Sequence, residues 1–216
     1  MEKPKIFGVG FQKTGTSSLQ RAFEILGYKS CGARPDLLLD ILNGRYKKVT
    51  KIVNKYEVFL DHPWPQIFDF LDEHYPGSKF ILTIREEEDW FKSVSNHVGD
   101  FRSPIHEWIY GKGYGLPKYN KKHTIEVYKK HQQKVIQYFS ERPNSLLIID
   151  FQHDFNWKTL CEFLNVQIPD VPFPHLNKTN YNARSDHKDR LGKIKYYRKR
   201  IKNKILLAYI NWKKLN

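Results

Sequence analysis

Short runs of apolar residues alternate along this chain with longer stretches whose apolar residues recur every three or four positions. The short runs have the length of strands and occur at 5–10, 57–60, 79–84 and 145–149. The longer stretches have the spacing of helices and occur at 16–26, 36–42, 47–56, 65–75, 86–97, 119–142 and 157–164. Strands that alternate with helices predict an α/β protein, a three-layer sandwich around a mostly parallel central sheet.

Two segments interrupt this alternation. Residues 101–117 are rich in aromatic residues and glycine without a clear period, which predicts a loop or lid, and residues 170–189 are irregular. From about residue 190 a last helix is predicted, and its apolar stripe comprises Ile194, Tyr197, Ile201, Ile205, Ala208, Trp212 and Leu215. We therefore expect one domain over 1–189, to which a basic amphipathic C-terminal helix over 190–216 is appended.

Positive charge is concentrated near the C-terminal end. The formal net charge is +14 over 216 residues. Residues 184–216 contain 12 Lys/Arg and 2 Asp/Glu, a balance of +10, so the preceding 183 residues carry only +4. This distribution weakens an argument for nucleic-acid binding, and we expect none. The final helix could dock on the domain, make peripheral contact with an anionic membrane or attract an acidic acceptor.

The first strand leads directly into a segment suited to binding an anion. It reads Gly8-Val9-Gly10-Phe11-Gln12-Lys13-Thr14-Gly15-Thr16-Ser17-Ser18 and joins the strand to a helix. Such a turn directs several backbone N–H groups at one point, where the helix dipole adds positive potential. Lys13 adds a full charge, and Thr14, Thr16 and Ser17 add hydroxyl donors. A plain tight turn is the alternative, but glycine, lysine and hydroxyl groups all converge here.

The two glycines have the spacing of a nucleotide-binding loop, but the lysine stands at a different position in it. Gly10 and Gly15 are five residues apart, as in G-x-x-x-x-G-K-[ST]. Thr16 stands where that motif has lysine, and Lys13 lies inside the loop instead. The relocated charge argues against ordinary ATP or GTP hydrolysis.

Residues 11–17 resemble the 5′-phosphosulfate loop, P-K-[ST]-G-T-[TS], of sulfotransferases that use 3′-phosphoadenosine 5′-phosphosulfate (PAPS). Gln12 replaces the proline, and Ser18 replaces a tryptophan that is frequent in the cytosolic branch, so the small microbial branch is more similar. The resemblance implies a P-loop NTPase-like fold. It also implies that PAPS is bound by Gln12, Lys13, Thr14, Gly15, Thr16 and Ser17.

A second anion site is predicted at the end of the strand at 79–84. Arg85 follows this strand directly, and Ser93 lies eight residues further on, in the next helix. A guanidinium group can bind a phosphate through two hydrogen bonds. The resemblance implies that this arginine and serine bind the 3′-phosphate of PAPS. Alternatively, Arg85 pairs with one of the acidic residues of 86–89 and Ser93 is an ordinary surface residue.

The catalytic base is predicted where the strand at 57–60 ends. Asp61 and His62 precede Pro63 there, and strand ends of this kind line the ligand crevice of open α/β sheets. Alignment on the proline places Asp61 where the cytosolic branch has its catalytic histidine. The small microbial branch tends to have D-x-P here, which agrees with Asp61, so we place Asp61 first and His62 second. As a base, Asp61 would need a pKa raised by burial, whereas His62 would need no such shift near neutral pH. Alternatively, Asp61 caps the helix that begins near Pro65.

The predicted reaction is in-line transfer of a sulfuryl group to a hydroxyl or amine. The base accepts the acceptor proton, and Lys13, Thr16 and the loop amides stabilise charge on the leaving phosphate. The histidines are scattered, so no metal is expected. The resemblance further implies that a late basic loop completes the 3′-phosphate site, with Lys178 and Arg184 as candidates.

Two other functions remain open. The apolar strand that ends at Asp150 is similar to the strand that holds magnesium in NTPases, which would suit a P-loop kinase. A non-enzymatic binder of nucleic acid or membrane surfaces through the basic tail is the other alternative, although no base-reading motif supports it. The acceptor could be a small molecule, a glycan or a lipid, and the sequence does not indicate an oligomeric state.

The chain carries no secretory signal at its N-terminus and no apolar run long enough to span a bilayer. Cys31 and Cys161 match no metal or redox spacing, which favours buried thiols in a reducing compartment. These features predict a cytoplasmic protein.

Overall fold

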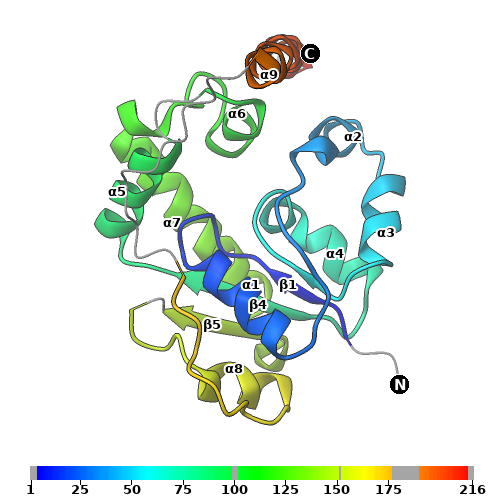
Figure 1. The fold of residues 1–216 in the computed structure, drawn as a ribbon, viewed down its shortest axis with the longest axis vertical. Coiled ribbons are helices and arrows are strands. Elements are labelled where there is room, and N and C mark those ends of the chain that lie inside the picture. The colour runs from blue at the N-terminus through cyan, green and yellow to red at the C-terminus, as the bar shows by residue number, and fades with distance from the viewer. Residues whose placement is uncertain (1–3, 99–101, 151, 177–189, 214–216) are drawn as a thin grey trace.

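A five-stranded sheet forms the centre of the computed structural model, which describes residues 4–98, 102–150, 152–176 and 190–213 (Figure 1). The strands are β1 (Ile6–Gly8), β2 (Ser30–Cys31), β3 (Val58–Phe59), β4 (Lys79–Ile84) and β5 (Leu146–Asp150). Their order is β2-β3-β1-β4-β5, and every neighbouring pair is parallel. The predicted α/β class is confirmed. The sequence pattern does not predict β2, which is two residues long.

Except for α6, the helices fall where the apolar spacing predicts them. They are α1 (Thr16–Ile25), α2 (Leu38–Leu42), α3 (Lys47–Val53), α4 (Phe68–His74), α5 (Glu87–Val98), α6 (Pro104–Tyr110), α7 (Lys121–Tyr138), α8 (Trp157–Leu164) and α9 (Arg190–Lys213). Short 3₁₀ helices precede several elements: η1 (Pro35–Leu37), η2 (Trp64–Ile67), η3 (Pro117–Tyr119) and η4 (Pro143–Ser145).

The sheet is covered by helices on both faces. In β1, Phe7 packs into a core with residues of α3, α4 and α7, whereas its neighbour Ile6 packs into a second core with residues of α1 and α8. Successive side chains of a strand point to opposite faces, so one strand serves both cores. The result is the predicted three-layer sandwich.

The segment 101–117 corrects the prediction of a loop or lid, because it contains α6. The Ser103 hydroxyl accepts a hydrogen bond from the His106 N–H at 3.3 Å, and Pro104 occupies the first turn. The buried positions of this helix include His106 and the fully buried Glu107, which bonds to Arg102 at 2.6 Å. The helix is only seven residues long, and polar residues occupy some of its buried positions, so the sequence shows no helical spacing of apolar residues there.

A third core lies between α5, α6 and α7. It consists of Phe11, Trp90, Val94, Tyr110 and Tyr128. Phe11 belongs to the loop after β1, so this core fixes the loop against three helices. It therefore also sets the distance between that loop and the first turns of α5.

Helix α9 lies across the end of the molecule, on α6 (Figure 1). Ile210 is fully buried, and the Tyr209 hydroxyl donates to Asn43 Oδ1 at 2.5 Å. The predicted helix is confirmed over 190–213. Its predicted stripe does not form the docked face, because Ile201 and Trp212 are 60% and 61% exposed. The division of the chain at residue 190 stays a prediction.

His131 of α7 joins that helix to the end of β1. Its Nε2–H donates to the Val9 carbonyl at 2.6 Å, and its ring stacks on Phe11 with 4.4 Å between centroids. Burial lowers the pKa of His131 to about 4. The neutral ring is therefore the form that the folded protein holds at neutral pH.

We predict that His131 makes unfolding easier in mild acid. Because its pKa is lowered to about 4 in the folded state from 6.5, the unfolded chain binds more protons between these values. The stabilisation is present above pH 6.5 and is lost as the pH falls toward 4, by about 3 kcal/mol in all. Urea unfolding from pH 7 to pH 4 measures it. His131→Gln, which keeps a donor but does not titrate, should show a shallower pH dependence, and an unchanged slope would contradict the assignment.

Candidate active site

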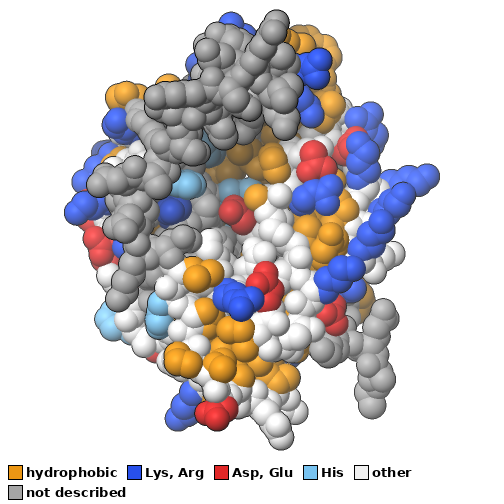
Figure 2. Space-filling view, in the orientation of Figure 1, with side chains coloured by type: hydrophobic (Ala, Val, Ile, Leu, Met, Phe, Trp, Pro, Cys, Tyr) orange, Lys and Arg blue, Asp and Glu red, His pale blue; other side chains and the backbone are white. Residues whose placement is uncertain are grey.

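A cavity of about 800 Å³ opens at the C-terminal ends of the central strands. Its lining comprises Gln12, Lys13, Gly15, Thr16, Ser17, Ser18, Ala33, Pro35, Asp61, His62, Arg85, Asp89, Lys92, Ser93, Asn96, His97, Ile105, His106, His175 and Leu176. Figure 2 shows the molecule hollowed below the α9 end, with histidine side chains at the hollow. The cavity brings together the loop after β1, the end of β3 and the start of α5, as the sequence predicts.

Two residues predicted to be catalytic have an unusual backbone conformation. Lys13 has φ 70° and Asp61 has φ 69°, and with Asn165 they are the non-glycine residues at positive φ in the described ranges. A side chain in the left-handed region is uncommon and costs free energy. Both Lys13 and Asp61 line the cavity. Strain at these two positions directs a cation and a carboxylate at the same space.

Thr14 holds the loop from beneath and does not line the cavity. Its buried hydroxyl donates to the Phe11 carbonyl at 2.6 Å, so the Thr83 hydroxyl, also at 2.6 Å, must be the donor of their shared hydrogen bond. The side chain of Thr14 is thus a brace between the loop and β4. Of the predicted loop residues, the other five line the cavity: Gln12, Lys13, Gly15, Thr16 and Ser17.

Gly10 permits this contact between loop and strand. A Cβ atom there would lie 2.5 Å from the Thr83 carbonyl oxygen and 2.8 Å from its nitrogen. These are backbone atoms of β4, which cannot move aside cheaply. Only glycine therefore allows the loop to leave β1 so close to β4.

Ser18 connects the loop to the segment before residue 177. Its hydroxyl accepts from the Leu176 N–H at 2.9 Å and donates to the Leu176 carbonyl at 3.3 Å. This pair of bonds brings His175 and Leu176 to the cavity wall. The sequence identifies Ser18 only as a departure from a motif, and its partner lies 158 residues away.

The residues of the second predicted anion site also line the cavity. Arg85 and the buried Ser93 both line it. The Arg85 main chain is fixed by Tyr128, whose hydroxyl accepts from the Arg85 N–H at 2.9 Å and donates to its carbonyl at 3.1 Å. Tyr128 in turn stacks on Trp90 of α5 at 3.9 Å between centroids. The sequence does not reveal this support, because it joins three separate elements.

The Asp61 carboxylate faces the cavity rather than a helix end. Its Oδ1 accepts the adjacent His62 N–H at 2.7 Å. The 3₁₀ helix η2 receives no side-chain cap, so the capping alternative is not what the structure has. Asp61 Oδ2 forms no hydrogen bond within the described part of the chain and is available to a ligand.

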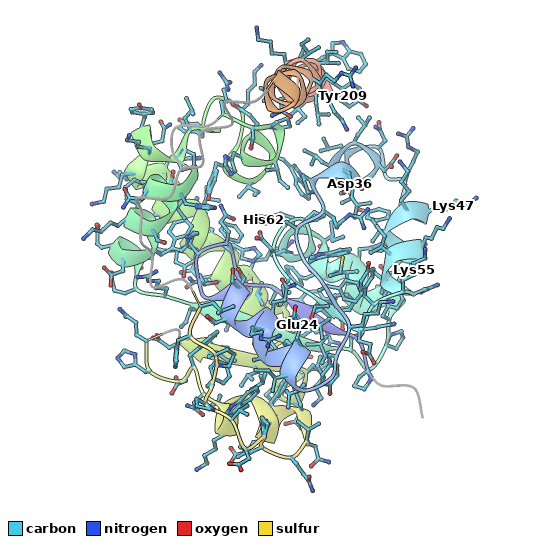
Figure 3. All side chains as sticks on the ribbon, in the orientation of Figure 1. Glu24, Asp36, Lys47, Lys55, His62 and Tyr209 are labelled. Atoms are coloured by element: carbon cyan, nitrogen blue, oxygen red, sulfur yellow. The ribbon has the colours of Figure 1, made fainter. Side chains whose placement is uncertain are left out.

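His62 is buried at the centre of a hydrogen-bond network (Figure 3). Its Nε2 contacts Gln12 Oε1, its Nδ1 lies 2.7 Å from the Gln66 amide, and Gln12 Nε2 donates to the Tyr110 hydroxyl at 3.2 Å. Burial lowers the pKa of His62, although Asp61 opposes this. A neutral imidazole donates from one nitrogen only. We assign that donor as Nε2, with the Gln66 NH₂ turned toward Nδ1, because this amide nitrogen otherwise lacks a partner.

His97 of α5 is a cavity residue that the sequence pattern does not single out. Desolvation and the Lys13 charge lower its pKa, while Asp61 raises it. His97 thus lies in the field of both predicted catalytic residues. His106 reaches the same cavity from α6. A helix pattern in the sequence reveals neither, because only the fold brings α5 and α6 to the loop.

Some predicted residues contribute elsewhere or cannot be placed. Lys178 and Arg184 lie outside the described residues. Asp150, on which the kinase alternative depends, is not part of the cavity lining and accepts from the Gln152 N–H at 2.7 Å. The described ranges contain no group of three or more His, Cys, Asp or Glu placed to hold a metal ion.

Comparison with known proteins agrees with this arrangement. A family model described as "Sulfotransferase domain" matches residues 5–181, so the chain belongs to the sulfotransferase family. The chain is also similar to a protein named "Ava biosynthesis cluster protein M" from Aspergillus versicolor. The two are 24% identical over an alignment of 217 positions that spans 84% of each chain. The resemblance found in the loop and in the Arg85–Ser93 pair is therefore confirmed at the level of the family.

We predict that Gly10→Ala destabilises the fold by about 1–3 kcal/mol, because the new methyl group meets the backbone of β4. Thermal unfolding of the two proteins measures the difference. Gly32→Ala is the matched control, since a Cβ at Gly32 lies 3.5 Å from its nearest neighbour, the Gln20 side-chain oxygen. Equal stability of the Gly10 variant and the wild type would show that the loop can move away from β4.

Proposed function

We propose that this protein transfers a sulfuryl group from PAPS to a hydroxyl or amine acceptor and that it needs no metal ion for this. One observation carries the proposal: a single cavity is lined both by the loop that contains Lys13 and by the Arg85–Ser93 pair. Asp61, which follows β3, lines the same cavity. PAPS carries two separate anionic groups, the 5′-phosphosulfate and the 3′-phosphate. An ordinary nucleoside triphosphate has no second group that would require Arg85 and Ser93.

The residues around the cavity fit such a donor. Lys13 forms no ion pair with a carboxylate in the described part of the chain, so its charge is available to an anion. Thr16 and Ser17 begin α1, where the helix dipole favours an anion. The volume of about 800 Å³ lies within the range of small-molecule and cofactor sites and leaves room for an acceptor beside the nucleotide.

When bound, PAPS supplies a sulfuryl group whose bond to the 5′-phosphate oxygen breaks as the acceptor forms its own bond to sulfur. Lys13 and the hydroxyls of Thr16 and Ser17 hold the 5′ end and stabilise negative charge there. Arg85 and Ser93 hold the 3′ end through charge-assisted hydrogen bonds. The protein thus contributes orientation and positive charge, as enzymes of phosphoryl transfer do.

Asp61 is the proposed base. Its Oδ2 is available in the cavity, while its Oδ1 is held by the His62 N–H at 2.7 Å. His62 is a positioning residue, because both of its ring nitrogens are engaged by glutamines. Through Gln12, the His62 ring connects the end of β3 to the phosphate loop. The roles of Lys178 and Arg184 at the 3′-phosphate stay a prediction from the resemblance.

The surroundings of the cavity bear on the acceptor and the compartment. Ile105 and His106 of α6 line the same cavity as the loop and suit an acceptor with both apolar and polar parts. Cys31 and Cys161 are buried free thiols, which fits a reducing compartment such as the cytoplasm. Because Asp150 lies away from the cavity, no observation favours the kinase alternative.

We predict that the product nucleotide, 3′-phosphoadenosine 5′-phosphate, binds without metal and that Lys13→Ala and Arg85→Ala each weaken its binding about 10- to 100-fold. Each substitution removes one charge-assisted contact to a phosphate. Calorimetry in the presence of EDTA measures the affinity. Lys55→Ala removes an exposed charge that follows α3 and does not line the cavity, so it is the matched control and should bind like the wild type. Preference for magnesium–ATP, or equal binding by all variants, would contradict the proposal.

We predict that Asp61→Asn lowers turnover about 10²- to 10⁴-fold while nucleotide binding stays unchanged, because general base catalysis has this magnitude. His62→Asn should weaken nucleotide binding in addition to lowering turnover, because it removes the contact that holds Gln12 of the phosphate loop. Transfer from radiolabelled PAPS to a panel of phenols, alcohols and amines measures turnover, and calorimetry measures binding. If His62→Asn abolished turnover with binding intact while Asp61→Asn stayed active, His62 would be the base.

A further inference from the structure

The outer side of α9 carries an apolar stripe that nothing in the described structure covers. Ile201, Ile205 and Trp212 are 60%, 67% and 61% exposed, and Ala208 between them is also exposed. These four residues follow one another at intervals of four, three and four, so they form one line along the helix. Large exposed apolar side chains scattered singly are ordinary, but a continuous line of them marks an interaction site.

The stripe lies opposite the side by which α9 docks on the domain. The docked side contains the fully buried Ile210, and Tyr209 beside it bonds to Asn43. At 100° per residue, Ile210 projects about 180° away from Ile201. One side of the helix is therefore already buried against the domain. The outer stripe is an additional apolar face that packing within the domain does not explain.

Basic residues flank the stripe. Arg198 and Lys202 lie on one side of it and Lys204 on the other, and all three are exposed. The sequence of α9, RLGKIKYYRKRIKNKILLAYINWK, contains nine Lys or Arg residues and no Asp or Glu. An apolar line with cationic borders is the pattern of a helix that lies in the plane of a membrane surface.

The positive charge of α9 distinguishes between the partners that could bind this apolar face. A second copy of α9 would bring its own cations against these, with no acidic residue to pair them. Nucleic acid would meet the cations but would leave the isoleucines and Trp212 unused. No described helix is long and apolar enough to cross a membrane. An anionic lipid surface complements the cations and the apolar line together.

We propose that the outer face of α9, defined by Ile201, Ile205, Ala208 and Trp212 with Arg198, Lys202 and Lys204, binds the surface of an anionic lipid membrane. The apolar side chains enter the boundary between headgroups and acyl chains, and the cations contact the headgroups. This inference does not depend on the proposed function, because none of these residues lines the cavity.

The test uses the full chain and vesicles of phosphatidylcholine, either pure or with about a third of phosphatidylserine. We expect co-sedimentation with the anionic vesicles only, which weakens as salt is added. Ile201→Asn with Ile205→Asn should lower the partition coefficient about tenfold or more, because two apolar side chains no longer enter the interface. Lys202→Gln with Lys204→Gln should lower it on anionic vesicles by a similar factor.

A matched control and a direct readout accompany these variants. Ile168→Asn replaces an isoleucine that is 56% exposed outside α9 and should bind like the wild type. Trp212 emission should shift to the blue on binding, and Trp212→Phe should remove that shift, because Trp64, Trp90 and Trp157 are buried and Trp108 packs against the core of the domain. The unfolding temperature of the exposed-site variants should match the wild type.

Three results would overturn the proposal. The first is no binding to anionic vesicles. The second is binding that the isoleucine substitutions leave unchanged, which would indicate simple charge attraction. The third is a dimer in sedimentation equilibrium that these same substitutions dissociate, which would show that a second copy covers the stripe.

Discussion

The hydrogen bond between the Thr14 and Thr83 hydroxyls, 2.6 Å long, fixes the predicted phosphate loop, residues 11–17, to the neighbouring strand β4. It forms only because Gly10 lets the chain leave β1 in contact with the Thr83 backbone. From this point the loop turns through the positive φ of Lys13 and Gly15 into α1. The same strand, β4, ends at Arg85. The spacing between the loop and Arg85, the two predicted anion sites, therefore depends on this buried contact with β4.

Polar groups around the cavity are supported by apolar packing behind them. The third core, with Phe11, Trp90 and Tyr128, lies behind both the loop and Arg85. Tyr128 uses its ring to stack on Trp90 and its hydroxyl to hold the Arg85 main chain. Burial of this hydroxyl raises the pKa of Tyr128, so it stays a neutral donor at any physiological pH. A water-excluded support of this kind keeps charged groups in place without moving during a reaction.

The sequence predicts those parts of the site that depend on local order. The phosphate loop, Arg85 with Ser93, and Asp61 with His62 each belong to a short strand-to-helix connection. The end of each parallel strand lies at the same edge of the sheet, so strand order alone brings them together. Contacts between segments that are distant in the sequence cannot be predicted from this local order. The Gln12–Tyr110 bond joins residues 98 positions apart, and Ser18 meets Leu176 across 158 positions.

Helices α6 and α9 show a different limit of the sequence pattern. In α6 the buried positions include His106 and Glu107, so no apolar period is visible. In α9 an apolar stripe predicts the helix correctly but says nothing of what the stripe faces. Ile210, which is the buried residue, lies off the stripe. Amphipathic spacing measures how apolar residues are arranged on a helix, and only the surrounding fold decides which side is enclosed.

The seat of α9 links the two walls of the cavity mechanically. It packs on α6, whose Ile105 and His106 form one wall, and Tyr209 reaches Asn43 at the end of α2, which continues from Pro35 of the other wall. Helix α9 thus contacts the structures behind both walls of the cavity. Movement of these two walls away from each other would stretch the Tyr209–Asn43 bond or separate α9 from α6. The spacing of these two walls is therefore coupled to the position of α9, although α9 itself contributes no residue to the cavity lining.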